Sequence, residues 1–265
     1  MAKAALTIAG SDSGGGAGIQ ADLKTFSALG VFGTSAITAI TAQNTQDVTA
    51  VEPISNAVVA AQIKAVLDDI DIHAVKIGML GSPELIQTVT DALADFAGPV
   101  VLDPVMLSKS GVALLPDDAV EALVTLLLPR ATVLTPNLPE AARILGEAEA
   151  VGDDTVLAQG QRILALGAKA VVMKGGHAEG EICRDWLVTS EGAIHFEAPR
   201  IQTRNTHGTG CTMSSAIAAE LAKGADLQGA LTRAHAWLHG AIKAADHIDI
   251  GHGHGPVHHF HETWT

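Results

Sequence analysis

A glycine-rich turn beside a cysteine is the first place in this sequence where chemistry could occur. The run Asn205–Ala216 contains the glycine pair Gly208 and Gly210, followed by small, helix-forming residues. The first turn of a helix has unpaired N–H groups and a partial positive charge, so it can hold an anion. Cys211 stands at this turn, where we expect its pKa to fall below about 8.5 and its thiolate to act as a base or nucleophile. The alternative is a small buried hydrophobic residue, the commoner role of a lone cysteine.

A second glycine-rich segment, Gly10–Gly18, follows a strand-like run and precedes a helix-like one. Glycines at such a junction let the backbone approach a ligand closely. The segment is neither a Walker A motif, which needs a lysine after its last glycine, nor the G-x-G-x-x-G dinucleotide fingerprint. A flexible turn is the alternative interpretation.

Charged and polar side chains also follow buried, strand-like runs. Asp103 can hold Mg²⁺ through water, and Lys174 suits phosphate oxygens. Asn137 and Glu140 follow another such run, although their spacing is equally that of a helix capping box. Carboxylates for Mg²⁺, a lysine for phosphate, a helix N-terminus and a base in Cys211 are together what phosphoryl transfer requires.

These side chains must be positioned by alternating strands and helices. Strands are predicted at Ala5–Ala9, Ala36–Ile40, Ala74–Ile77, Val100–Leu102, Val133–Thr135 and Ala170–Met173. Apolar residues at helical spacing predict three helices between the early strands, one containing Ile19, Leu23 and Phe26, a second containing Val59, Ile63 and Val66, and a third containing Leu85, Val89 and Leu93.

The later part of the chain has a different order. Leu187–Thr189 and Ala193–Glu197 predict a hairpin, and helices are expected over about 209–223 and 227–246. Because strands and helices alternate first, we expect an α/β fold with a largely parallel sheet and helices on both faces. Ligands of such folds bind at the carboxyl ends of the strands.

Composition limits the function classes. The chain has 265 residues, 48% of them hydrophobic, and no linker-like stretch, so we expect a single domain over residues 1–265. Its two cysteines lack metal-type spacing, and its net charge of −13 disfavours nucleic acids and anionic membranes. Without a signal peptide or a membrane-length apolar run, we expect a cytoplasmic protein with a small-molecule ligand, no nucleic acid partner and no membrane partner.

The motifs together resemble those of the hydroxymethylpyrimidine/phosphomethylpyrimidine kinases of thiamine biosynthesis. The resemblance runs nearly end to end, and its motifs are Gly10–Lys24, Ala42–Thr45, Lys76–Leu80, Asp103–Met106, Thr135–Glu140, Met173–His177, Asn205–Ser215 and the tail Gly255–His261. It implies a ribokinase-like three-layer α/β/α sandwich and one activity, the ATP- and Mg²⁺-dependent phosphorylation of 4-amino-5-hydroxymethyl-2-methylpyrimidine and then of its monophosphate. It also implies a homodimer.

The same resemblance implies residue roles. Cys211 is the expected general base, where sugar and pyridoxal kinases of the wider fold usually carry aspartate, and Gly208 and Gly210 form the anion hole. Gln43 is expected to bind the aminopyrimidine edge, since a carboxamide offers the complementary donor and acceptor. The rest of the implied substrate pocket is Gly10, Ala17, Asp22, Met79 and Val105. The implied ATP and Mg²⁺ residues are Lys174, Asp103, Asn137, Glu140 and Thr209, with Asp103 and Glu140 acting on the metal through water.

Parts of the sequence also fit three alternative functions and one metal site. A pyridoxal kinase of the same fold is the nearest, but the loop Leu107–Val112 lacks the second cysteine of dual-activity relatives. A non-catalytic pyrimidine-binding protein leaves the phosphate-site residues unexplained. A cysteine hydrolase using His207 and Cys211 lacks an orienting partner, and a metal site in the histidine-rich tail lacks an acid or thiol ligand.

Overall fold

In the computed structural model, which describes residues 2–106, 114–177 and 180–264, nine strands form one sheet in the order β3-β2-β1-β4-β5-β6-β7-β8-β9. The strands are β1 (Ala4–Asp12), β2 (Phe32–Gln43), β3 (Val48–Pro53), β4 (Ala74–Ile77), β5 (Val100–Leu102), β6 (Val133–Leu134), β7 (Ala170–Met173), β8 (Ile182–Thr189) and β9 (Gly192–Pro199). The six strands from β2 to β7 in this order pair in parallel, and the pairs β2–β3, β7–β8 and β8–β9 are antiparallel.

The predicted mostly parallel sheet and the late hairpin are therefore confirmed. The bounds of several elements differ from the sequence prediction, and two of the differences concern the strands beside the glycine-rich loop. β3 was not predicted, and β1 continues three residues beyond Ala9, so that Gly10 and Asp12 belong to the strand rather than to the turn after it. The continuation follows from the pairing of Ser11 and Asp12 with β2 across a register shift.

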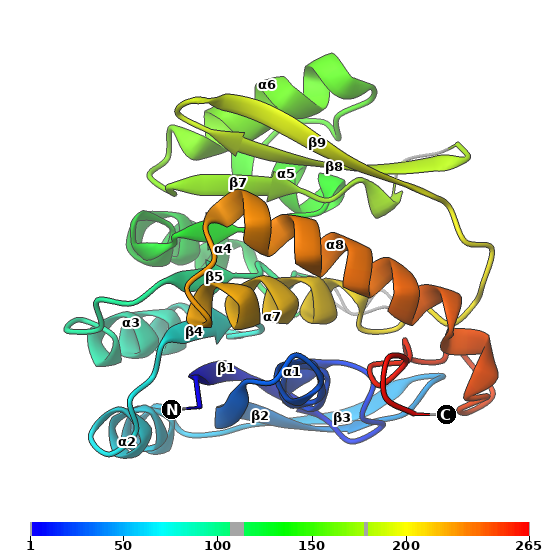
Figure 1. Ribbon diagram of the computed structural model, residues 1–265. Helices are drawn as coiled ribbons and strands as arrows, with labels where there is room; N and C mark the ends of the chain where they lie inside the picture. Colours follow the sequence, from blue (N-terminus) through cyan, green and yellow to red (C-terminus); the bar gives the residue numbers. More distant parts are fainter. Residues whose placement is uncertain (1, 107–113, 178–179, 265) are drawn as a thin grey trace.

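Helices cover both faces of the sheet, giving three layers. Their bounds are α1 (Gly18–Ala28), α2 (Asn56–Leu67), α3 (Pro83–Ala92), α4 (Asp117–Ala122), α5 (Leu138–Leu145), α6 (Asp153–Leu164), α7 (Thr209–Ala222) and α8 (Leu227–Lys243), with short turns η1 (Leu123–Leu127), η2 (Leu128–Arg130), η3 (Gly175–His177) and η4 (Ala245–His247). Helices α1, α7 and α8 lie on one face, where α7 and α8 pass in front of the sheet in Figure 1. Helices α2 to α6 cover the other face.

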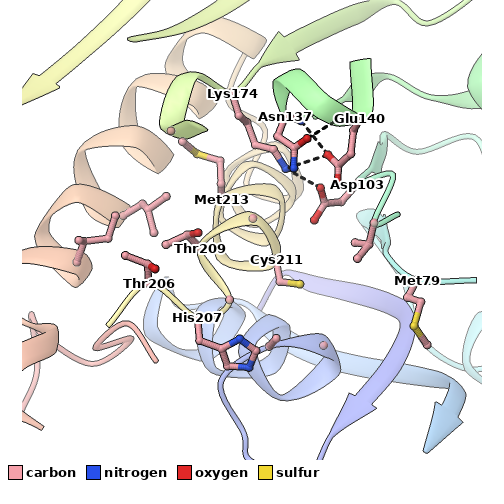
Figure 2. Close-up of a pocket in the computed structure, with 18 of the residues that line it drawn as sticks. Met79, Asp103, Asn137, Glu140, Lys174, Thr206, His207, Thr209, Cys211 and Met213 are labelled. Atoms are coloured by element: carbon pink, nitrogen blue, oxygen red, sulfur yellow. Dashed lines mark hydrogen bonds and ion pairs between the residues drawn. The ribbon is translucent and has the colours of Figure 1, made fainter. Parts of the chain in front are cut away.

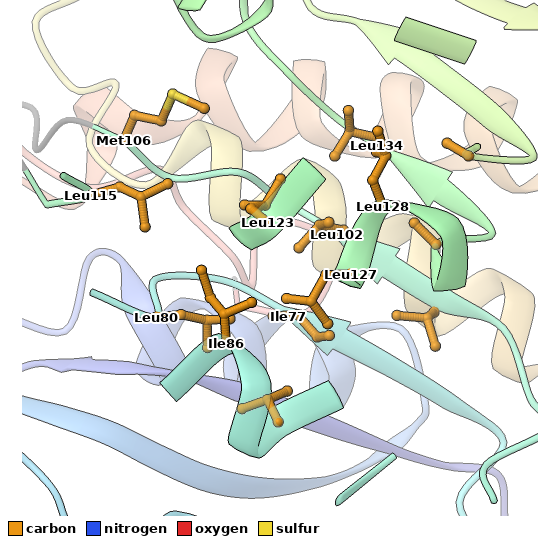
Figure 3. Packing of buried hydrophobic residues seen from close by; sticks show 14 of the residues in the cluster. Ile77, Leu80, Ile86, Leu102, Met106, Leu115, Leu123, Leu127, Leu128 and Leu134 are labelled. Carbon is orange, nitrogen blue, oxygen red and sulfur yellow. The ribbon is translucent and has the colours of Figure 1, made fainter. Parts of the chain in front are cut away.

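Each face of the sheet has its own hydrophobic core. On the α2 to α6 side, Ile77, Leu102 and Leu134 of neighbouring strands pack against Ile86 of α3 and Leu127 of η1 (Figure 3). Strands buried on both faces need apolar residues at successive positions, which is why the central strands are almost uninterrupted apolar runs. The parallel order brings the carboxyl ends of β1, β4, β5, β6 and β7 to one edge of the sheet.

No helix in the part of the chain that the structure describes is both long and apolar enough to cross a membrane.

Candidate active site

A pocket of about 680 Å³ opens at the carboxyl ends of the strands. This volume lies within the range of small-molecule sites. Thirteen of the fourteen site residues predicted from the sequence line it, namely Gly10, Ala17, Gln43, Met79, Asp103, Val105, Asn137, Glu140, Lys174, Gly208, Thr209, Gly210 and Cys211. The exception is Asp22.

The N-terminus of α7 forms the centre of the pocket floor. Gly208 caps the helix at φ 80°, and a Cβ atom there would lie 1.8 Å from the carbonyl oxygen of Gly16. Only glycine therefore lets the turn before α7 approach the glycine-rich loop after β1. The N–H groups of the first helical turn, which include those of Gly210 and Cys211, have no partners within the helix and can receive an anion.

The structure corrects the expected acidity of Cys211. Burial raises the pKa of its thiol to about 11, even though the Lys76 ammonium and the Gly18 N–H, which donates to the sulfur, act in the opposite direction. The carboxylates of Asp22 and Asp103 raise it further. The helix N-terminus is thus outweighed by desolvation and by two nearby negative charges, and the pocket without ligands holds a thiol rather than a thiolate.

An ion-pair cluster lies beside Cys211. Lys174 Nζ donates to Asp103 Oδ1 at 2.8 Å and lies 3.9 Å from Glu140 Oε2 (Figure 2). Although burial raises the pKa of Asp103, the ammonium groups of Lys174 and Lys76 hold it below its ordinary value. Burial lowers the pKa of Lys174, but Asp103 and Glu140 raise it above the ordinary value overall. Asp103 and Lys174 are therefore both charged at neutral pH.

Asn137 and Glu140 form a helix capping box and also line the pocket. Asn137 Oδ1 accepts from the Glu140 N–H, and Glu140 Oε2 accepts from the Asn137 N–H, each at 2.8 Å, which completes a capping box on α5. The same carboxylate faces Lys174 inside the pocket. Burial raises the pKa of Glu140 to about 7, with Lys174 lowering it and Asp103 raising it. Capping and a place in the site are therefore compatible.

The donor set suits Mg²⁺ only in part. Asp103 and Glu140 offer the hard oxygen atoms that Mg²⁺ prefers. Among the residues that the structure describes, no group of three or more histidine, cysteine, aspartate or glutamate side chains is placed to hold a metal ion. Mg²⁺ at these two carboxylates would need water and phosphate oxygens for its other positions, as in most phosphoryl-transfer sites.

The other end of the pocket contains the predicted substrate residues. Gly10 lies within β1 and so near Met79 that a Cβ atom there would lie 2.7 Å from Met79 Cε. Gln43 ends β2, and its carboxamide lies 3.3 Å from both Thr41 Oγ1 and His207 Nε2. Ala17 and Val105 complete this part of the wall. The arrangement combines an apolar slot with one amide that can donate and accept.

Asp22 does not touch the pocket, which contradicts its predicted contact with the substrate. Its side chain is 0% exposed, and its carboxylate receives both hydrogen bonds of the Lys76 ammonium at 2.9 Å. The hydroxyl groups of Thr7 and Ser215 donate to it at 2.6 Å. Asp22 is therefore the buried counter-ion of Lys76, and Lys76 is the member of the pair that lines the pocket.

The sequence did not predict a role for Asp12 or the pairing of His207 with it. Asp12 accepts from the N–H groups of Gly14, Gly16 and Ala17 and from His207 Nε2 at 2.8–3.0 Å, so it shapes the glycine-rich loop. The Asp-x-Gly spacing at positions 12–14 was a detectable turn signal. His207 pairs with Asp12 rather than serving Cys211 as a hydrolase base would.

The far end of the pocket is largely apolar and was also missed. It is lined by Ala198, Pro199, Ile201, Met213, Leu238 and Ile242, from β9, α7 and α8 and from the segment after β9. Leu238 and Ile242 are spaced like ordinary core residues of a helix, so the sequence carried no signal for them. The loop Leu107–Val112, whose lack of a cysteine bears on pyridoxal as a substrate, lies outside the residues that the structure describes.

Comparisons with known proteins point to one family. The family model of phosphomethylpyrimidine kinase matches residues 12–258. A hydroxymethylpyrimidine/phosphomethylpyrimidine kinase from Rhizobium meliloti is 57% identical over 265 residues, covering 100% of this chain and 99% of the relative. A thiamine biosynthesis bifunctional protein from Geobacter sulfurreducens is 46% identical over 96% of this chain and 51% of its own. The solved ADP complex of Bacillus subtilis pyridoxal kinase matches with a TM-score of 0.92 and 38% identity, covering 100% of both chains.

Proposed function

The chain belongs to the phosphomethylpyrimidine kinase family, and we propose how its pocket performs two successive phosphorylations. The enzyme transfers a phosphoryl group from ATP to the hydroxymethyl group of 4-amino-5-hydroxymethyl-2-methylpyrimidine and then to the resulting monophosphate, giving the pyrophosphate used in thiamine biosynthesis. The observation that carries the proposal is one pocket joining an amide-bearing slot, a helix N-terminus with a cysteine, and a lysine-carboxylate cluster.

The pyrimidine occupies the slot between β1, β2 and β4. The carboxamide of Gln43 pairs with the amino group and the adjacent ring nitrogen, because it carries one donor and one acceptor side by side. Met79 and Val105 supply apolar walls, and the backbone at Gly10 and Ala17 closes the slot. This places the hydroxymethyl group toward Cys211 at the start of α7.

Cys211 removes the proton of the attacking hydroxyl group, and the N–H groups of Gly208, Thr209 and Gly210 stabilise the charge on the transferred phosphoryl group. The thiol has a pKa of about 11 without ligands. The thiol therefore ionises only when substrate binding changes the charges around it. The carboxylate of Asp103 raises the pKa of the thiol, so neutralising that carboxylate would favour ionisation.

ATP occupies the opposite end. Lys174 contacts its phosphate oxygens, and the apolar surface formed by Met213, Leu238 and Ile242 covers the base. Asp103, Asn137 and Glu140 organise the phosphates and would hold Mg²⁺ through water. When bound, Mg²⁺ supplies positive charge that offsets the negative charge of the phosphates.

An ATP-consumption assay with and without the pyrimidine tests this function. Consumption that depends on the pyrimidine supports the kinase, and binding of the pyrimidine without consumption supports a non-catalytic binding protein. The related pyridoxal kinase fold makes pyridoxal the necessary comparison substrate. Because Leu107–Val112 contains no cysteine, we expect pyridoxal to be at most a side substrate.

Opposite effects are expected from substitutions at the two ends of the pocket. Lys174→Ala should lower kcat roughly 10²–10³-fold, the cost of removing one preorganised donor to a developing charge, with little effect on pyrimidine affinity. Gln43→Ala should raise the Kd for the pyrimidine about 10–100-fold through the loss of two hydrogen bonds, with little effect on ATP affinity. Steady-state turnover of each variant measures kcat, and calorimetric titration with each ligand measures the two affinities. An exchanged pattern would mean that the two subsites are reversed.

Glu140→Gln separates capping from catalysis. The amide oxygen can still accept from the Asn137 N–H, so the capping box and the melting temperature should be largely preserved. Above the pKa of about 7, where the Glu140 carboxyl is ionised, losing the negative charge should weaken productive binding of Mg²⁺ and ATP and shift the Mg²⁺ dependence of turnover to higher concentration. Thermal melting and turnover at several Mg²⁺ concentrations are measured together. If activity and Mg²⁺ dependence are unchanged, Glu140 is a helix cap only.

Three broader features belong to the same proposal. Residues 1–265 act as one kinase domain, which the continuous nine-stranded sheet of the described residues supports. The enzyme works in the cytoplasm as a homodimer. The exposed apolar side chains Ile40 and Val51, 44% and 43% exposed on β2 and β3, support a partner surface at this end of the sheet. Sedimentation equilibrium tests the dimer.

A further inference from the structure

The imidazole of His207 lies between the glycine-rich loop and the amide of Gln43. It is 8% exposed, and its Nε2 lies 2.8 Å from Asp12 Oδ2 and 3.3 Å from Gln43 Nε2. The ring also packs on Gly16, where a Cβ atom would lie 2.4 Å from His207 Cδ2. Figure 2 shows the ring on the side of Cys211 away from the Lys174 cluster. Its position is therefore closely confined.

The neighbours decide which ring nitrogen carries hydrogen. The carboxylate of Asp12 accepts from three backbone N–H groups, and it can only accept when ionised. The Nε2 of His207 must therefore donate to it. A ring nitrogen that carries hydrogen cannot accept from the amide NH₂ of Gln43. In this orientation of the amide, two donors therefore face each other.

A second conflict of the same kind exists on the other side of the amide. Thr41 Oγ1 gives its single proton to the carbonyl oxygen of Ser11 at 2.7 Å. Toward Gln43 Oε1, 3.3 Å away, it can then only accept. After a half-turn of the Gln43 amide, its nitrogen donates to Thr41 Oγ1, and its oxygen becomes the second, longer acceptor of the single His207 Nε2–H, at the 3.3 Å position beside Asp12 Oδ2 at 2.8 Å. No two donors then face each other.

We propose that His207 and Thr41 lock the Gln43 carboxamide with its oxygen toward His207 and its nitrogen toward Thr41, which makes His207 a specificity-determining positioning residue. This inference rests on the proposed function. In the locked amide, one oxygen lone pair and one N–H remain free for the ligand. The donor and acceptor of the site thus have fixed places.

The consequence is discrimination between two nearly isosteric pyrimidines. The 4-amino compound presents an amino donor beside a ring-nitrogen acceptor, and these match the free lone pair and N–H of the locked amide. The 4-oxo analogue presents a carbonyl acceptor beside a ring N–H donor, which is the reverse pattern. A locked amide meets it acceptor to acceptor and donor to donor, whereas an amide free to rotate can accommodate it.

The experiment compares kcat/KM for the two pyrimidines in the full-length enzyme. In His207→Leu the ratio of the 4-amino to the 4-oxo value should fall roughly tenfold, the worth of about one hydrogen bond. Thr41→Val, which removes the second contact and leaves Asp12 untouched, should lower the ratio in the same direction. Thr34→Val is the matched control, because Thr34 lies on the same strand and its hydroxyl donates only to the Ala5 carbonyl at 3.2 Å; its ratio should equal that of the unsubstituted enzyme.

The outcomes distinguish a failure of the proposed function from a failure of the positioning role of His207. If the unsubstituted enzyme does not phosphorylate the 4-amino pyrimidine, the proposed function fails. If it does, and both His207→Leu and Thr41→Val reduce activity on the two pyrimidines by the same factor, the positioning role is overturned and His207 only supports the glycine-rich loop. If His207→Leu does not fold, the ratio measured for Thr41→Val decides alone.

Discussion

Cys211→Ala is expected to lower kcat about 10²–10⁴-fold, the range for loss of a general base. The pyrimidine should still bind, because Gln43 and the apolar walls of the slot are separate from the thiol. The measurement is turnover of the purified variant together with calorimetric titration of the pyrimidine. Wild-type turnover in this variant would show that the thiol only fills space.

Cys211→Ser is the sharper companion. Serine keeps the shape of the side chain, but its hydroxyl group does not ionise in the working pH range, so turnover should fall about as far as in the alanine variant. The pKa of about 11 without ligands adds a further expectation. Activity of the unsubstituted enzyme should rise with pH over the range in which the thiol of the substrate complex ionises, and this rise should be missing in Cys211→Ser.

Lys76→Met is expected to destabilise the fold by about 3–5 kcal/mol, because it leaves the carboxylate of Asp22 buried without its cation. Both side chains are 0% exposed, so water cannot replace the missing charge. The hydroxyl groups of Thr7 and Ser215 would be the remaining donors to the carboxylate. Urea denaturation followed by circular dichroism gives the free energy of unfolding.

The double variant Lys76→Met/Asp22→Leu tests whether the lost stability comes from the unpaired carboxylate of Asp22. Replacing both members of a buried ion pair with apolar residues is often close to neutral, so much of the lost stability should return. A single variant that loses less than about 1 kcal/mol, the size of a surface pair, would mean that Asp22 is not held as a buried carboxylate.

The strand ends were predictable because their signal is local. Asp103 and Lys174 each follow a short, wholly apolar run that is rich in valine and too short for a helix, which favours a buried strand. The α/β order then places these residues at one edge of the sheet without knowledge of any contact. The turn before Cys211 was recognisable for the same reason, because a glycine pair and a helix start stand within a few residues.

Other features depended on contacts between distant segments. Asp22 reads as an ordinary helix residue until the fold places Lys76 of another strand against it. The pKa of Cys211 follows from burial and from carboxylates of α1 and the β5 end, which outweigh the local effect of the helix N-terminus. His207 meets Asp12 across 195 positions of sequence, so its role had no local signal.

The sequence by itself thus determined the layered fold and the edge of the sheet that holds the site, because apolar periodicity and turn chemistry act over a few neighbouring residues. The resemblance of its motifs to a known family supplied the substrate residues of the pocket, such as Gln43 and Met79. Only the tertiary structure decided the protonation states of the site residues and the orientation of their side chains. Desolvation and Coulomb interactions depend on the distance between groups in space, and for Lys76, Cys211 and His207 the groups that matter come from other elements.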